Sequence, residues 1–255
     1  MAKGSGLGDR FYVDGYDLSG DVASLDQMSG GPAPLDTTAL NQFANSRIGG
    51  LRDGTLSFTT FFNYVAIPPP FTEHNALSPL DIPDEVCTYF HGAAIGNPAA
   101  SLNAKQMNYD PTRGTDGSLT LKVDMTANGF GLEWGIELTP GIRTDTTATA
   151  AGPSNSFDTG ASAAFGGQAY LQVFSVTGTS VTVAIWDSAD NITFAAVAGM
   201  AFAAATPAGT PESFRIAIAN TATIRRYVAV ATTGTFTNAQ FAVMLHKNEI
   251  AGITF

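Results

Sequence analysis

Short runs of alternating side chains, separated by turn-forming residues, constrain the fold of this chain more than any other feature of its sequence. Four such runs follow one another at 85–90, 101–109, 118–125 and 130–139. The turn pairs Asp116-Gly117 and Asn128-Gly129 separate the later ones, and such pairs favour tight hairpins because both residues tolerate positive φ. Strand-like runs at intervals of roughly 8–12 residues predict an antiparallel β-sandwich or barrel.

The second half of the chain repeats this pattern and suggests how the chain is divided. Further runs lie at 168–177, 180–188, 192–197, 213–220, 225–232 and 236–247, with turn signals between them. A chain of 255 residues is long enough for one large β domain or two small ones. We expect an N-terminal β region over 1–143 and a C-terminal β-sandwich over 166–255, joined by a linker or loop over 144–165. A single β domain over 1–255 is the alternative.

Two segments depart from the strand pattern. Asp36 is a suitable N-cap, Leu40 and Phe43 follow at helical spacing, and Gly49-Gly50 is a suitable stop. These signals predict one short helix at about 37–48. Five prolines lie between residues 68 and 83, so we expect a long irregular loop over 64–84.

The charge of the chain argues against a nucleic-acid-binding protein. Charged residues make up 13% of the sequence, against about 25% in average soluble chains. The formal net charge is −10, and residues 1–143 carry 16 acidic and 8 basic side chains. Duplex binding requires clustered Lys and Arg that displace counterions, and this chain does not offer them.

Cysteine content and hydropathy indicate whether we expect disulfides, a signal peptide or a membrane span. The single cysteine, Cys87, excludes an internal disulfide. The opening MAKGSGLGDR has no apolar stretch, so we expect no signal peptide. No window approaches 18 uncharged apolar residues, so we expect no membrane span.

The sequence offers no pattern that predicts catalysis, a metal or a cofactor. It has no G-x-S-x-G elbow, no phosphate-binding G-x-x-x-x-G-K-[ST] loop and no H-x-x-x-H pair among His74, His91 and His246. Cys87 and His91 share a strand face but lie about 13 Å apart at strand spacing, too far for a nucleophile–base pair. We therefore expect a protein that is not an enzyme.

The most patterned turn is Trp186 to Phe194. Asp187, Asp190 and Asn191 supply oxygen ligands, and Trp186 supplies a stacking surface, so a calcium or sugar site is one interpretation. The other interpretation is a stabilised hairpin corner, because Asp and Asn bond the local backbone and tolerate the left-handed conformation.

Nearly the whole sequence, in order, resembles the tail tube (major tail) proteins of long-tailed, siphovirus-type bacteriophages, especially phages of actinobacteria. The resemblance includes GLGDRFYVDGYDLSGDVASLD and RIGGLRDGTLSFTTFFN, and continues through 102–141, 165–199 and 225–248. It implies a β-sandwich subunit of the tail-tube type that closes into a ring, usually a hexamer, and rings that stack into a tube. The implied partners are copies of the chain, the tape-measure protein, and tail completion and tail tip proteins. The implied location is the virion tail, after synthesis in the host cytoplasm.

The resemblance also implies a function for the acidic side chains. Tubes of this family conduct DNA, and an acidic wall repels phosphate, so DNA passes without binding. The candidates for lumen-facing carboxylates are Asp14, Asp17, Asp21 and Asp26, and ordinary solvated turn carboxylates are the alternative. Two other functions stay open: a minor tail or tail terminator ring protein, and a carbohydrate-binding decoration module that uses the Trp186 turn.

Overall fold

The computed structural model describes residues 5–64, 73–80 and 84–250, and these form an antiparallel β-structure with one short α-helix. This confirms the fold class predicted from the sequence. The elements of the first half are β1 (Arg10–Val13), β2 (Tyr16–Asp17), β3 (Val22–Asp36), β4 (Arg47–Phe61), α1 (Glu73–Leu77), β5 (Glu85–Phe90), β6 (Pro98–Gln106), β7 (Asp110–Arg113), β8 (Leu119–Ala127) and β9 (Glu133–Glu137). Those of the second half are β10 (Arg143–Asp145), the 3₁₀-helix η1 (Pro153–Asn155), β11 (Ser156–Asp158), β12 (Gly167–Ser188), β13 (Ala195–Ala201), β14 (Glu212–Ile218) and β15 (Tyr227–Lys247).

The strands of the first half surround one hydrophobic core. Strands β1, β5, β6 and β9 lie side by side, and β8 joins them to β4 and β3. Inward-facing residues alternate along β4 and β8, and they meet others from β1, β5, β6 and α1. The core residues include Phe11, Leu18, Phe58, Leu77, Leu102, Leu121, Val123 and Met125.

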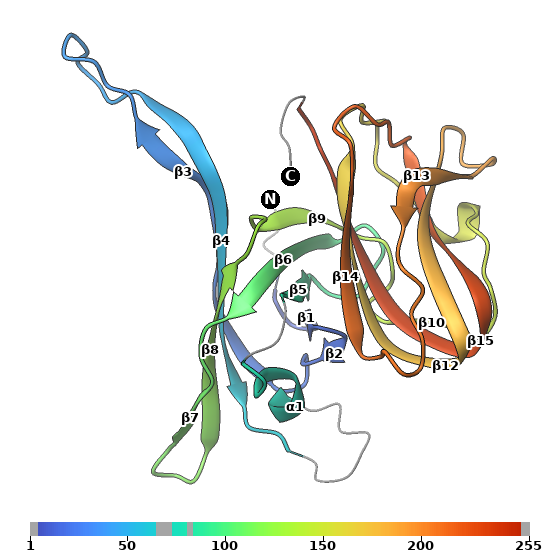
Figure 1. The fold of residues 1–255 in the computed structure, drawn as a ribbon, viewed down its shortest axis with the longest axis horizontal. Helices are drawn as coiled ribbons and strands as arrows, with labels where there is room; N and C mark the ends of the chain where they lie inside the picture. The colour runs from blue at the N-terminus through green and yellow to red at the C-terminus, as the bar shows by residue number, and fades with distance from the viewer. Residues whose placement is uncertain (1–4, 65–72, 81–83, 251–255) are drawn as a thin grey trace.

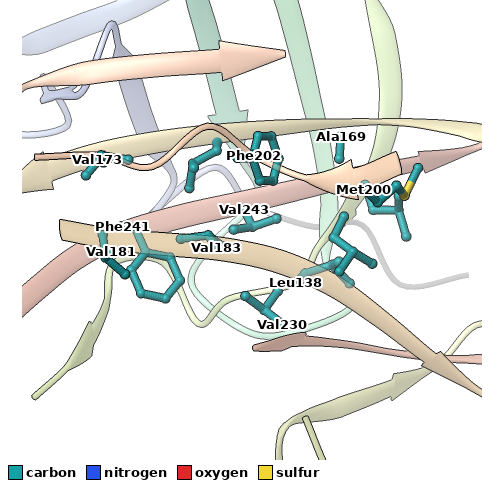
Figure 2. Packing of buried hydrophobic residues seen from close by; sticks show 14 of the residues in the cluster. Leu138, Ala169, Val173, Val181, Val183, Met200, Phe202, Val230, Phe241 and Val243 are labelled. Atoms are coloured by element: carbon teal, nitrogen blue, oxygen red, sulfur yellow. The ribbon is translucent and has the colours of Figure 1, made fainter. Parts of the chain in front are cut away.

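Two very long strands organise the second half. β12 and β15 pair from Gly167↔Lys247 to Ser188↔Tyr227, with irregular register around Ser175 and Gly178. β14 pairs with the first part of β12 and β13 with its last part. Figure 2 shows the core that these strands enclose, where valines of β12 and β15 meet Met200, Phe202 and Leu138.

A third cluster of buried side chains connects the two halves. Tyr12 and Phe90 from the first half pack against Tyr170 and Phe174 of β12, with the Tyr12 and Phe174 ring centroids 5.0 Å apart. β15 also pairs with β9, so the backbone hydrogen bonding continues across the junction. The division into domains at 143 and 166 stays a prediction.

The predicted helix at 37–48 is wrong. β3 and β4 form one hairpin in which Leu35 faces Ile48 and Asp36 faces Arg47, and the connecting residues form its tip. Asp36 does accept a bond from the backbone N–H of Thr38, at 2.8 Å, but within a turn. A helix of three turns is marginal on its own, and here the cross-strand pairing determines the conformation instead.

The predicted linker and the predicted loop both contain regular structure. β10 and β11 pair with β15, so residues 143–158 lie along the C-terminal core. α1 lies inside the segment predicted as a loop over 64–84, of which 65–72 and 81–83 fall outside the described residues.

The sequence pattern predicted a turn between the runs 168–177 and 180–188. In the structure Gly178 instead lies at a bulge within β12. Its φ is 133°, and a Cβ there would lie 2.6 Å from the Cα of Phe236. Glycine permits both this conformation and the close approach of the partner strand. The two runs predicted on either side of it are therefore one strand.

Candidate functional site

The most distinctive surface of the molecule is the distal part of the β3–β4 hairpin, residues 31–53, which we call the arm. Thr55–Phe61 of β4 pair with β8, whereas beyond Gly54 the described strands β3 and β4 pair only with each other. Six extended residues from Gly31 to Asp36 span roughly 20 Å. The arm therefore projects well away from the body (Figure 1).

Close packing fixes the point where the arm leaves the body. Gly54 lies opposite Gly30 in the hairpin. A Cβ on Gly54 would lie 2.7 Å from the backbone N of Leu132 and 2.8 Å from Cδ1 of Leu102. The segment before β9 thus packs directly on the backbone of the hairpin, and this contact sets the direction of the arm.

The arm carries apolar side chains that its own chain leaves exposed. Leu40 and Phe43 at the tip are fully exposed, and Leu51 is 87% exposed. Leu35 and Ile48 form an exposed cross-strand pair behind them. Residues 37–46, which we call the tip, contain no charged side chain. A two-stranded ribbon is marginally stable by itself, and contiguous exposed apolar surface marks interaction sites. The arm therefore has the exposed apolar side chains that interaction surfaces commonly carry.

Open sheet edges accompany the arm. In the described part of the chain, β3 pairs only with β4, and β7 pairs only with β8. Each strand therefore presents an outer edge with backbone groups that can accept a further strand. β7 is only four residues long and contains Pro111, and β3 contains Pro32 and Pro34, which have no backbone N–H to donate. The part of β3 before Pro32 is therefore the longer open edge, and open edges promote association between chains.

The four predicted lumen carboxylates do not share one environment. Asp14 lies in the β1–β2 turn and accepts a bond from Ser213 Oγ at 2.7 Å, and burial raises its pKa. Its carboxylate is thus directed at β14. Asp17 accepts from the backbone N–H of Ser19 at 3.0 Å.

The remaining two carboxylates lie nearer the surface. Asp21 accepts from Asn63 Nδ2 at 3.0 Å, and Asp26 is exposed and accepts from Thr59 Oγ1 at 3.0 Å. The structure does not bring all four together. Each of the four accepts a hydrogen bond within the chain, and the donor to Asp14 is the one that lies on β14, far away in the sequence.

The residues of the Trp186 turn are bonded to their own chain. Asp187 accepts from Nε and the backbone N–H of Arg225, both at 2.7 Å. Asp190 accepts from the backbone N–H groups of Ile192 and Thr193, and these bonds lower its pKa to about 2. Asn191 has a φ of 59° and accepts from Ser156 Oγ at 2.7 Å. These contacts match those of a stabilised hairpin corner.

Trp186 is the last of the predicted candidates, and two histidines that the sequence did not predict as ligands also have partners within the chain. Trp186 is half-buried in β12, opposite Ala196 and Ala229. His74 Nδ1 lies 2.6 Å from the Tyr109 hydroxyl, and His91 Nδ1 lies 3.0 Å from Asp9. Within the described ranges, no three His, Cys, Asp or Glu side chains are arranged to hold a metal ion. No helix among these residues has the length and apolar character to span a bilayer.

Sequence reasoning missed three carboxylates that the fold buries. Glu73, Glu85 and Glu137 are each at most 1% exposed. Desolvation raises their pKa values to about 7, 8 and 8 respectively. Glu85 and Glu137 lie in the predicted strand runs 85–90 and 130–139, but the sequence did not show that the fold buries these carboxylates.

Comparisons with known proteins gave matches among solved structures alone. No family model and no curated protein matches the sequence. The tail of an empty GTA particle with C6 symmetry is 15% identical, with a TM-score of 0.38, and the match covers 51% of this chain and 96% of that one. The SPP1 Dit protein is 12% identical, with a TM-score of 0.33 and coverage of 93% and 99%. A chain of the phage p2 baseplate is 8% identical, with a TM-score of 0.32 and coverage of 95% and 99%.

Proposed function

We propose that this chain is a structural subunit of a bacteriophage tail, without catalytic activity, and that it assembles with copies of itself into rings. The observation that carries the proposal is the arm, a projecting ribbon whose fully exposed Leu40 and Phe43 have the character of a docking element. The sequence resemblance to tail tube proteins supports the same conclusion from the residues themselves.

The more specific proposal is the major tail tube subunit. Rings, hexameric by resemblance, would stack into the tube through which DNA leaves the virion. The open edge of β3 before Pro32 supports it, because pairing between neighbouring copies joins their sheets and removes exposed edges. The tape-measure protein, the completion proteins and the tip proteins are the further partners that this role entails.

Electron microscopy of negatively stained protein, together with sedimentation velocity, tests this proposal. We expect rings or stacked rings for the wild type. Phe43→Asp should require at least tenfold higher concentration to assemble, about 1.4 kcal/mol, with a melting temperature unchanged because the side chain is exposed. Ile192→Asp is the matched control, since Ile192 is an exposed apolar residue of the distant β12–β13 turn.

Two results would contradict the proposal, and one would refine it. A wild-type monomer at every concentration would overturn ring assembly. Assembly of Phe43→Asp at wild-type concentrations would remove the role of the arm. Single rings that never stack would favour the minor tail or terminator protein over the tube subunit.

We also propose that acidic side chains line the DNA path, with Asp17, Asp21 and Asp26 as the candidates that remain after Asp14 is placed against β14. Their replacement by lysine should leave tubes intact in micrographs and slow DNA ejection from the virion, because lysine binds phosphate through counterion release. Ejection at the wild-type rate from tubes of normal appearance would exclude these residues as wall charges.

A further inference from the structure

A large groove lies at the end of the molecule where β9, the segment after β11 and the end of β15 meet. Its volume is about 970 Å³. Its apolar lining includes Trp134, Ile136, Phe157, Phe165 and Leu245, and Trp134 is 50% exposed. In the described part of the chain, nothing lies over Trp134 that would remove it from solvent.

Several polar side chains of the groove bond to the chain itself, whereas Asn248 Oδ1 is buried without a hydrogen-bond partner among the described residues, and Glu249 is exposed. Lys247 Nζ donates to Thr159 Oγ1 at 2.7 Å and to the carbonyl of Ala161 at 2.8 Å. Asn248 Nδ2 donates to the carbonyl of Phe165 at 2.8 Å, and Asp158 accepts two bonds from Arg226. The aromatic side chains of Trp134, Phe157 and Phe165 line the same groove. The groove therefore suits an occupant that inserts large apolar side chains.

The chain itself contains a segment of this chemistry in its tip. The tip has no charged residue and carries Leu40 and Phe43, both fully exposed. The groove has room for both side chains, since its volume lies near the upper end of ordinary binding pockets, about 300–1,000 Å³. In Figure 1 the arm points away from β12 and β15, so a subunit does not fill its own groove.

We propose that the groove of one subunit receives the tip of a neighbouring copy, which gives the docking element of the proposed function its acceptor site. Tip and groove are different surfaces, so the contact is heterologous: each subunit donates to one neighbour and accepts from another. Contacts of this type generate closed rings when the rotation closes and continuing stacks when it does not. The inference rests on the proposed function.

Chemical cross-linking of the full chain tests this pairing. Ala44 in the tip and Ala161 in the groove are both exposed, and the double variant Ala44→Cys/Ala161→Cys places one thiol on each surface. Cys87 is fully buried and burial raises its pKa, so it does not compete. With a short bismaleimide we expect a ladder of dimers, trimers and higher species, at least tenfold stronger than in Ala44→Cys/Ala208→Cys. Ala208 is an exposed alanine outside the groove.

A second variant separates the groove from ring assembly as such. Ala164→Arg adds a long charged side chain to the groove from an exposed position, and should raise the concentration for assembly at least tenfold, with an unchanged circular dichroism spectrum. If wild-type rings form and Phe43→Asp disrupts them, but the ladder is absent and Ala164→Arg assembles normally, the groove is overturned and the proposed function stands. If the wild type forms no rings, the proposed function itself fails. Equal ladders from the Ala161 and Ala208 pairs would also overturn the groove.

Discussion

Glu85 shows how burial alone changes the chemistry of a residue. It begins β5, is 1% exposed, and neither carboxylate oxygen has a hydrogen-bond partner among the described residues. Desolvation is the main cause of its pKa of about 8, the charge of Asp14 raises it further, and Lys105 opposes the shift. The carboxyl group is therefore neutral in the folded protein at pH values where an exposed glutamate is ionised.

Glu85→Gln should reduce the dependence of stability on pH. Between about pH 4.5 and 8 the folded state holds a proton that the unfolded state has lost, so the stability of the wild type falls as pH rises through this window. The side chain at position 85 of the variant is uncharged at every pH. At pH 8.5 we therefore expect the variant to melt at a higher temperature than the wild type, by about 2–4 °C for each kcal/mol of difference in the free energy of unfolding. At pH 4.5 the two should agree closely.

Thermal unfolding followed by circular dichroism from pH 4.5 to 9 makes this measurement. Glu249→Gln is the control, because Glu249 is exposed. If the pH dependence of Glu85→Gln matches that of the wild type, the carboxyl group of Glu85 is ionised in the folded state.

At the scale of elements, the segment from β10 to β11 shows how side chains fix a stretch without sequence periodicity. Arg143 donates to both carboxylate oxygens of Asp145, each at 2.8 Å, and to the carbonyl of Val230 at 3.0 Å. Thr232 Oγ1 also donates to Asp145. Arg143 and Asp145 are 12% and 6% exposed. Their bonds to Val230 and Thr232 hold β10 against β15, and the bidentate pair keeps both side chains in place in this partly desolvated site.

Asp145→Ala should be strongly destabilising. It leaves the Arg143 guanidinium in a partly buried site without its carboxylate, and breaking a buried pair in this way costs about 3–5 kcal/mol. Urea unfolding measures the loss. Asp158→Ala breaks the exposed pair with Arg226 and should cause a much smaller change, because surface pairs contribute little. Similar losses in the two variants would mean that burial of the Arg143 pair is unimportant.

At the scale of the whole molecule, polar contacts join the two halves in addition to the aromatic cluster. Arg215 of β14 donates to Glu133 at 3.1 Å and to the Tyr170 hydroxyl at 3.0 Å. Its guanidinium lies 3.5 Å from the centroid of the Phe130 ring. Gln172 of β12 donates to the carbonyl of Val86 at 2.7 Å. Polar groups of each half thus find hydrogen-bond partners in the other half.

These contacts predict that the halves unfold together. Trp134 reports on the first half and Trp186 on the second, so Trp186→Phe and Trp134→Phe each leave one probe. In each variant, the urea transition followed by tryptophan fluorescence should have the same midpoint and slope as the transition followed by circular dichroism. Two separated transitions would instead establish independent domains over 1–143 and 166–255.

Features that depend on local chemistry could be predicted from the residues alone. Alternation and turn pairs identified the antiparallel β class, and the run 85–90 matches the bounds of β5. The turn pairs were right in part: β7 and β8 pair on either side of Asp116-Gly117, but β8 and β9, which flank Asn128-Gly129, are not paired with each other in the described structure. In both turn pairs the glycine has a positive φ and the residue before it does not. The local bonding of Asp190 was visible because an Asp side chain bonds backbone N–H groups two or three residues on.

Tertiary structure decided wherever a partner distant in sequence competes with local preference. Asp36, Leu40 and Phe43 have helical spacing, yet the pairing of β3 with β4 makes them part of a hairpin and its tip. Gly178 is a residue type that favours turns, but β12 pairs with β15 on both sides of it, so the strand continues through a bulge. The raised pKa of Glu85, the projection of the arm and the shape of the groove also depend on which strands pack together. These contacts join residues that lie far apart in the chain, so no local pattern predicts them.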